Sequence, residues 1–246
     1  MLERDWISLC RHVQDGFIYV TLIVHTYMLY LIAYKSPKEI GKYKYLMVYV
    51  SIFEMAYATF GTVLKPVVLS YTSRIIVLVD ARNIWLNRTV TRVINSAICG
   101  FYGCTASILT IHFMYRYGSL QMATSSIFEG WKFILLCLLP VCYGIIWSTT
   151  VFFVFPEDPG FSELIRNDMW DFFGIHVEDV VYTGMYYYKE DKYRLYGFEF
   201  LACFGMFILC FIIMSSLGIV LVFGYRCYNT MNSWRAHSVS LSTKNI

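Results

Sequence analysis

Long apolar runs divide the chain into five segments that are each long enough to cross a bilayer as a helix. A bilayer core about 30 Å thick needs about 20 predominantly apolar residues in a helix. Among Asp, Glu, Lys and Arg, only Glu54 and Arg116 lie inside these runs. The predicted helices are residues 16–34, 45–64, 93–117, 133–155 and 200–225.

The connections between these runs alternate in length. Residues 35–44 and 118–132 form short connections, whereas residues 65–92 and 156–199 form long ones. Short connections at one end and long ones at the other are typical of an up-and-down bundle. The pattern therefore predicts an all-α membrane protein, with one membrane domain over residues 1–246 and a tail at 226–246.

The charges near the membrane ends favour an extracellular N-terminus. Cytoplasmic loops carry an excess of Lys and Arg, counted over short loops close to the bilayer. The short connection 35–44 holds four such residues, Lys35, Lys38, Lys42 and Lys44. Four arginines in the connection 65–92, on the opposite side of the membrane, argue weakly against this orientation, namely Arg74, Arg82, Arg88 and Arg92.

A glycosylation sequon agrees with the lysine-rich connection. The tripeptide Asn87-Arg88-Thr89 can be modified only if the connection after the second helix lies outside. We therefore expect a multi-pass plasma-membrane protein in which Asn87 is a candidate glycosylation site. In that orientation 65–92 and 156–199 are outer loops, 35–44 and 118–132 are inner loops, and 226–246 is a cytoplasmic tail.

Composition supports a bilayer partner and argues against several other classes of function. The chain is 58% hydrophobic and only 15% charged, whereas soluble proteins carry about 25% charged residues. A net charge of +3 indicates no nucleic-acid partner. The eight cysteines form neither a C-x-x-C spacing nor a Cys/His cluster, so we expect no metal site and no cofactor. No catalytic motif is present, and an enzyme is not expected.

Glu54 is the acid that a membrane segment tolerates least. It lies about nine residues inside the second helix, or about 13 Å deep at 1.5 Å per residue, where a charge costs about 2.5 kcal/mol or more. Thr105 and Ser107 are expected at a similar depth, with His112 nearer the cytoplasm. Three interpretations stay open for Glu54: a structural or switching polar contact, a direct ligand contact, and a protonated acid without a special role.

The third helix ends in Tyr115-Arg116-Tyr117, for which two interpretations compete. Tyrosine favours the membrane interface and arginine extends towards headgroups, which explains the run without any signalling role. Alternatively, Arg116 lies where signalling receptors present an arginine to a G protein. Position alone does not separate the two.

The order of these features resembles the nematode seven-helix chemoreceptors of the Str class (serpentine receptor class r). The resemblance covers nearly the whole chain and is carried by short motifs rather than by one signature. The motifs are Lys35-Ser36-Pro37-Lys38, Gly41-Lys42-Tyr43-Lys44-Tyr45-Leu46-Met47, Ile52-Phe53-Glu54, Pro66, Ser70, Ser73, Cys99-Gly100, His112 to Tyr117, Pro140, Tyr143-Gly144, Trp147, Glu178-Asp179, Tyr182 and Gly184.

The resemblance implies a G-protein-coupled receptor that detects small odorant molecules on the sensory cilia of chemosensory neurons. It implies a rhodopsin-like architecture of which five of seven helices are present, and a heterotrimeric G protein as partner of a full-length receptor. A receptor dimer is a further partner that it allows. It also favours Arg116 and its tyrosines as the coupling end, and makes Glu54 a feature of the family scaffold.

The chain differs from this family at its end. Family members continue into sixth and seventh helices, whereas this sequence stops at Ile246. We therefore expect a fragment or truncated isoform that cannot signal alone. The alternative is a non-signalling membrane protein that associates with full-length receptors and regulates them. A transporter or channel is a weaker alternative, because Glu54 alone does not form a polar path.

Overall fold

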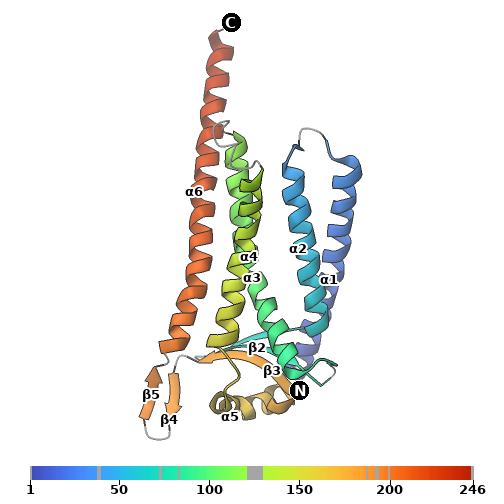
Figure 1. Ribbon diagram of the computed structural model, residues 1–246, viewed down its shortest axis with the longest axis vertical. Helices are drawn as coiled ribbons and strands as arrows, with labels where there is room; N and C mark the ends of the chain where they lie inside the picture. Colours follow the sequence, from blue (N-terminus) through green and yellow to red (C-terminus); the bar gives the residue numbers. More distant parts are fainter. Residues whose placement is uncertain are drawn as a thin grey trace. The chain divides into compact units, whose positions relative to one another are not determined.

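Five long helices dominate the described part of the computed structural model of the protein (Figure 1). The structure describes residues 2–37, 40–71, 74–82, 84–120, 130–186, 188–191, 194–198 and 200–244. Each long helix contains a stretch that is long and apolar enough to cross a membrane, which confirms the five predicted membrane helices. They are α1 (Leu2–Lys35), α2 (Tyr43–Leu64), α3 (Arg88–Leu120), α4 (Trp131–Val154) and α6 (Phe200–Lys244).

All five helices extend beyond the apolar runs that predicted them, and α1, α3 and α6 extend furthest. Helix α1 begins at Leu2 rather than near residue 16, and α6 continues to Lys244 through the segment predicted as a tail. Neither extension contains proline or glycine, so nothing in the local sequence ends the helix where the apolar run ends. Helix α3 begins at Arg88 because Asn87 caps it, its Oδ1 accepting a hydrogen bond from the Thr89 N–H at 3.1 Å.

The two predicted inner connections lie partly outside the described residues. Residues 38–39 of the first connection and 121–129 of the second are not among them. Helix α2 begins at Tyr43, within the first connection, and α3 continues to Leu120, within the second. Both connections are therefore shorter than the apolar pattern predicts.

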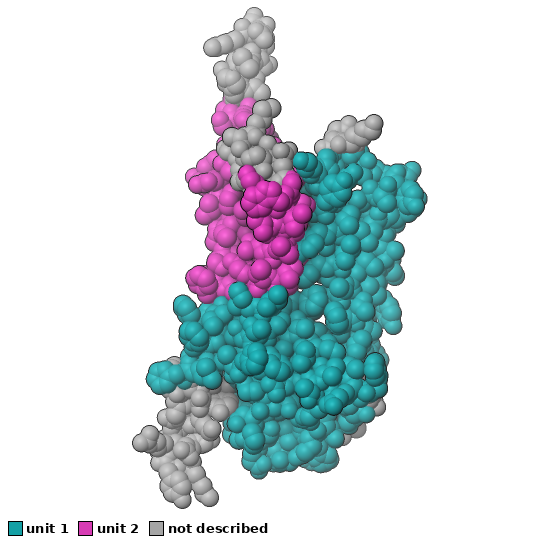
Figure 2. Space-filling model, viewed as in Figure 1, with its two compact units in different colours: residues 1–102, 144–209 teal, residues 103–143, 210–246 magenta. Residues whose placement is uncertain are grey.

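The chain forms two compact units, coloured separately in Figure 2. The first contains residues 1–102 and 144–209, and the second contains residues 103–143 and 210–246. Helices α3, α4 and α6 therefore each contribute to both units. The first unit also contains the described strands, so the two long connections between helices fold together there.

A three-stranded antiparallel sheet joins the two long connections. Strand β2 (Arg74–Asp80) lies between β1 (Val67–Tyr71) and β3 (Val180–Tyr186), with Val77 opposite Thr183. A separate hairpin pairs β4 (Tyr188–Asp191) with β5 (Arg194–Phe198). The sequence analysis described both connections only as loops. The all-α description therefore holds for the membrane helices, while the two long connections contain strands.

Helix α5 (Pro159–Asp168) packs on this sheet, and together they form what we call the sheet cap: β1, β2, β3, α5 and the short turns at Met169–Phe173 and Val177–Asp179. Asp158 caps α5, its Oδ2 accepting from the Phe161 N–H at 3.0 Å. Phe161 is buried against Ile76 and Tyr182 in the core of the cap. Gly184 makes room for the Phe161 ring, because a Cβ there would lie 2.5 Å from Phe161 Cε1.

Helices α3 and α4 approach each other closely at Gly100. A Cβ added at Gly100 would lie 2.6 Å from the Gly144 carbonyl oxygen and would also collide with the Ser148 hydroxyl. Small residues allow such close approach of membrane helices. Because the Gly144 carbonyl is part of the α4 backbone, it can move only if the helix moves.

We expect Gly100→Ala to destabilise the protein by about 1–3 kcal/mol, the usual cost of overpacking. The measurement is the thermal unfolding midpoint of the purified protein in detergent. Gly218→Ala is the matched control on α6, since a Cβ there meets no other atom within 4 Å. An unchanged midpoint for Gly100→Ala would contradict the close approach of the two helices.

Candidate functional site

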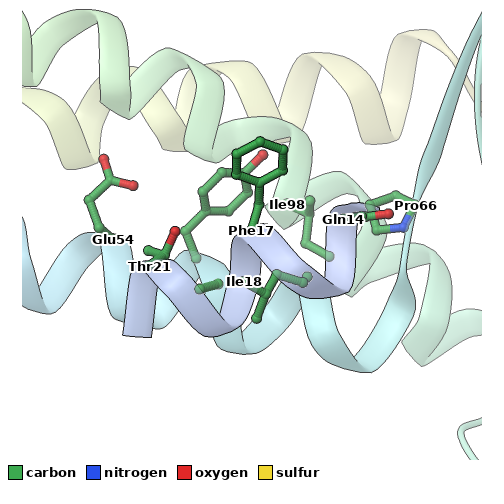
Figure 3. Close-up of a pocket in the computed structure, with 10 residues that line it drawn as sticks. Gln14, Phe17, Ile18, Thr21, Glu54, Pro66 and Ile98 are labelled. Carbon is green, nitrogen blue, oxygen red and sulfur yellow. The ribbon is translucent and has the colours of Figure 1, made fainter. Parts of the chain in front are cut away.

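Glu54 lies at one end of a slot between α1 and α2 in the first unit (Figure 3). The cavity has a volume of about 240 Å³, which is smaller than most drug-sized ligand sites. Its wall combines aromatic, apolar and polar side chains of α1 and α2 with Pro66 and with Ile98 of α3. The slot is defined by Gln14, Phe17 and Thr21 of α1 and Glu54, Tyr57 and Gly61 of α2.

Sequence reasoning found Glu54 but missed its neighbours on α1. Gln14 lies before the first apolar run, in the part of α1 that the hydropathy pattern left out. Phe17 and Thr21 are ordinary members of that run. A helical face could have been suspected from their spacing of three and four residues, since such residues share one face. The spacing does not indicate which other helix this face of α1 packs against.

His25 of α1 and Tyr57 of α2 are titratable groups that interact electrostatically with Glu54. The Nδ1 of His25 is buried and has no hydrogen-bond partner among the described residues. Glu54 itself makes no ion pair with any residue that the structure describes. The carboxyl group and the imidazole therefore form a polar pair of groups in an otherwise apolar part of the first unit.

The predicted partners of Glu54 on α3 belong to the second unit. Ser107 is fully buried, and its hydroxyl oxygen has no hydrogen-bond partner in the described part of the chain. Thr105 is exposed and His112 is half-buried. The predicted contact of Glu54 with Thr105, Ser107 or His112 stays a prediction.

Within the second unit, a polar contact joins α3 to α6 at a residue that sequence reasoning missed. The buried Thr110 hydroxyl lies 3.2 Å from the Ser216 carbonyl and at the same distance from the Ala106 carbonyl, and it can donate to either. Thr110 follows Ser107 by three residues, so the two share a helix face. The sequence signal that could have found Thr110 is its hydroxyl, which follows the Ser107 hydroxyl at a spacing that places both on one helix face.

The end of α3 presents Arg116 while its tyrosine neighbour packs against α6. The Tyr117 ring meets the Phe223 ring edge to face, with centroids 5.4 Å apart. The Arg226 guanidinium lies over the same Tyr117 ring, 5.9 Å from its centroid. Arg116 is exposed, and Tyr115 is half-buried. Tyr117 therefore has a packing role, whereas the arginine remains accessible.

Arg88, the first residue of α3, joins the sheet cap to the helices through three hydrogen bonds. Its Nε donates to the Glu157 carboxylate at 3.0 Å, and its Nη1 and Nη2 donate to the carbonyls of Glu178 and Val180, each at 2.9 Å. The second carboxylate oxygen of Glu157 accepts from the Tyr182 N–H at 3.2 Å. One guanidinium thus connects α3, the segment after α4, and strand β3. We call this network the Arg88 clamp.

The other three arginines that argued against the predicted orientation also have partners. Arg74 pairs with Asp168 at 3.0 Å, and Arg82 pairs with Asp80 at 2.8 Å. Arg92 donates to the Phe152 carbonyl at 3.1 Å and lies over the Phe152 ring. Arg74 and Arg92 therefore join segments that are far apart in the sequence, whereas the Arg82 pair is local.

Asn95 connects α3 directly to the sheet. Its side chain is fully buried, and its Nδ2 approaches Thr183 Oγ1 at 3.4 Å and the Val77 carbonyl at 3.5 Å. Both partners belong to one register pair of β2 and β3. Sequence reasoning overlooked Asn95, although an amide inside an apolar run needs a partner.

No group of three or more His, Cys, Asp or Glu side chains that could hold a metal ion occurs among the described residues. The cysteines whose side chains the structure describes are free thiols, and they lie in the membrane helices.

Comparison with known proteins gives the family. Residues 10–246 match the family described as "Serpentine type 7TM GPCR chemoreceptor Str". The chain belongs to the Str family of serpentine chemoreceptors. No solved structure matches it. The resemblance stated from the motifs is thereby confirmed.

Curated nematode proteins of the Str family and of serpentine receptor class r are similar along most of the chain. G-protein coupled receptor str-217 of Caenorhabditis elegans is 30% identical over 85% of this chain and 60% of its own length. G-protein coupled receptor str-33 of the same species is 22% identical, over 76% of this chain and 56% of its own length. Serpentine receptor class r-10 of C. elegans is 23% identical, over 92% of this chain and 67% of its own length. The chain thus spans about 60% of the length of the first of these relatives.

In this Str-family chain, Asp80 should make the stability of the sheet cap depend on pH. Hydrogen bonds from Arg82, with a further one from Arg11 of α1, hold the pKa of Asp80 below its ordinary value. A group whose pKa is lower in the folded state than in the unfolded state stabilises the fold at pH values above its unfolded-state pKa, which is about 4 for aspartate. That contribution is lost as the pH falls through the folded-state pKa.

We expect Asp80→Asn to lower the free energy of unfolding at pH 7 by about 1 kcal/mol, which is a typical contribution of a partly exposed ion pair. The difference between the variant and the wild type should shrink as the pH falls below ~4, because the Asp80 carboxyl group is then protonated first in the unfolded state and, at lower pH, in the folded state. Thermal unfolding of both proteins across this pH range measures it. A difference that is constant with pH would exclude a charge-based role for Asp80.

Proposed function

We propose that this chain acts in a chemosensory receptor that binds small odorant molecules and, in its full-length form, couples to a heterotrimeric G protein. The observation that carries the proposal is the match of residues 10–246 to a chemoreceptor family. Two relatives named as G-protein coupled receptors support the coupling. The proposed location is the plasma membrane of the sensory cilium.

The lysine-rich connection 35–44 supports an extracellular N-terminus. The positive-inside rule counts Lys and Arg in short loops near the membrane ends and gives Asp and Glu little weight. The short connection holds four lysines, whereas Arg74, Arg82 and Arg88 are spread along the longer connection 65–92. These three arginines form ion pairs within the first unit, so their positions also have a structural explanation. In the proposed orientation the sheet cap is extracellular and the lysine-rich connection 35–44 is cytoplasmic.

The slot supports ligand binding inside the membrane region. Ligand sites are concave and mostly apolar, with a few polar groups that fix orientation. The slot has these properties, with Phe17 and Tyr57 beside Glu54 and Thr21. Of the three interpretations left open for Glu54, the slot favours direct ligand contact.

A regulatory role is the second candidate function, and one experiment separates the two. The chain is expressed with a calcium reporter, alone and together with the longer relative str-217, and both are exposed to a panel of volatile compounds. A response from the chain alone supports the receptor function. A silent chain that lowers the response or surface level of the relative supports association with full-length receptors. Absence of both effects contradicts both functions.

The proposed orientation predicts that Asn87 carries an N-linked glycan. Asn87 is exposed, and its Nδ2 is left available by a cap that uses Oδ1. Digestion with an N-glycosidase should increase the gel mobility of the wild type but not of Asn87→Gln. As a control for topology, a second sequon placed in the connection 35–44 should stay unmodified. A glycan on that inner sequon would reverse the orientation.

Arg116 should matter for coupling and not for folding, because its side chain is exposed. Arg116→Ala is expected to lower ligand-dependent G-protein activation about tenfold or more with unchanged surface level. A tenfold change corresponds to about 1.4 kcal/mol of lost interaction. Arg235→Ala removes another exposed cation from α6 and serves as the control. Equal effects of both variants would favour the headgroup-contact interpretation of Arg116.

A further inference from the structure

We infer that the slot takes a small primary amine in its ammonium form, with Glu54 as the counter-charge. This inference rests on the proposed receptor function and names the chemical class of its ligand. Figure 3 shows the Glu54 carboxyl group at one end of the slot and Gln14 with Pro66 at the other. The ligand would place its ammonium group at Glu54 and its hydrocarbon part between the aromatic side chains.

The charge balance of the slot favours a cation. A carboxylate inside a membrane segment is costly unless it is paired. None of the described residues that line the slot is Lys or Arg. Lys65, which follows the slot along the chain, pairs with Asp15 at 2.8 Å and is thereby committed elsewhere. His25 interacts electrostatically with Glu54 but makes no ion pair with it in the described part of the chain, so a ligand ammonium would supply the missing charge.

The aromatic side chains of the slot also favour an ammonium group. Phe17 and Tyr57 both line it, and the face of an aromatic ring attracts a cation within about 6 Å. The Tyr57 ring is fixed by stacking on Phe101, with centroids 5.1 Å apart. A neutral alcohol would gain neither the ion pair nor the cation–π attraction. A carboxylate ligand would be repelled by Glu54.

The dimensions of the slot favour a short chain. Glu54 and Gly61 are seven positions apart on α2, or about 10 Å at 1.5 Å per residue. Gly61 leaves space beside Ile18, since a Cβ there would meet only Ile18 Cδ1 at 3.8 Å. Ala58 and Ile98 complete the apolar wall. An amine with about six carbons fits this length.

The experiment measures binding of hexylamine to the full chain in lipid nanodiscs by saturation-transfer NMR. Hexanol and hexanoate, which share the alkyl chain, test the charge. Glu54→Gln removes the counter-charge and keeps a similar shape. Gly61→Leu keeps Glu54 but fills the slot, and Thr59→Ala changes an exposed α2 residue outside it.

We expect hexylamine to bind at least about tenfold more tightly than hexanol or hexanoate. Glu54→Gln should weaken hexylamine binding about tenfold or more, Gly61→Leu should abolish it, and Thr59→Ala should leave it unchanged. Equal binding of hexanol, or undiminished binding to Glu54→Gln or to Gly61→Leu, would overturn the inference. If one variant fails to fold, the other still tests the slot.

The binding measurement is independent of signalling, so the two proposals can fail separately. Hexylamine binding without any cellular response would leave the inference intact and contradict the receptor function. A cellular response to other volatile compounds, without slot-dependent amine binding, would contradict the inference and leave the receptor function intact.

Discussion

The Arg88 clamp is the interaction on which the extramembrane part of the first unit depends. A single guanidinium satisfies one carboxylate and two carbonyls from segments about 70 to 90 positions away in the sequence. A positive charge at the N-terminus of a helix interacts unfavourably with the helix dipole. The ion pair with Glu157 offsets this cost for Arg88 at the start of α3. Because Glu157 also accepts the Tyr182 N–H, the same pair fixes where β3 begins to follow β2. The position of α5 on the sheet follows from that register.

The membrane helices were predictable because the bilayer imposes one rule on every spanning segment. Backbone groups must be satisfied internally, so an apolar run of sufficient length becomes a helix whatever its neighbours are. The sheet cap obeys no such local rule. Strand β2 has the β-branched sequence expected of a buried strand, Arg74-Ile-Ile-Val-Leu-Val-Asp80, and it could have been suspected. Its partner β3 lies about 100 residues further on, and no pattern in either strand specifies that pairing.

The candidate site was predictable in part, for the same physical reason. Glu54 stands out because a charge in a membrane segment is costly, whatever surrounds it. Gln14 and Phe17 do not stand out, since polar and aromatic residues near a helix end are ordinary. Their significance arises only when α1 and α2 pack side by side, and the relative rotation of two helices is set by the whole interface. Thr110 and Asn95 carried a weaker signal, a polar group in an apolar run that needs a partner.

The distribution of charge pairs connects the stability of the first unit to its proposed specificity. At the end that carries the sheet cap, acids and bases neutralise each other: Asp15 with Lys65, Asp80 with Arg11 and Arg82, Asp168 with Arg74, and Glu157 with Arg88. These pairs stabilise the fold of the first unit. Glu54 is different, because the described residues around it provide an imidazole and aromatic rings but no Lys or Arg. A carboxyl group that the fold does not neutralise is the feature that would let the slot distinguish an amine from an alcohol of equal size.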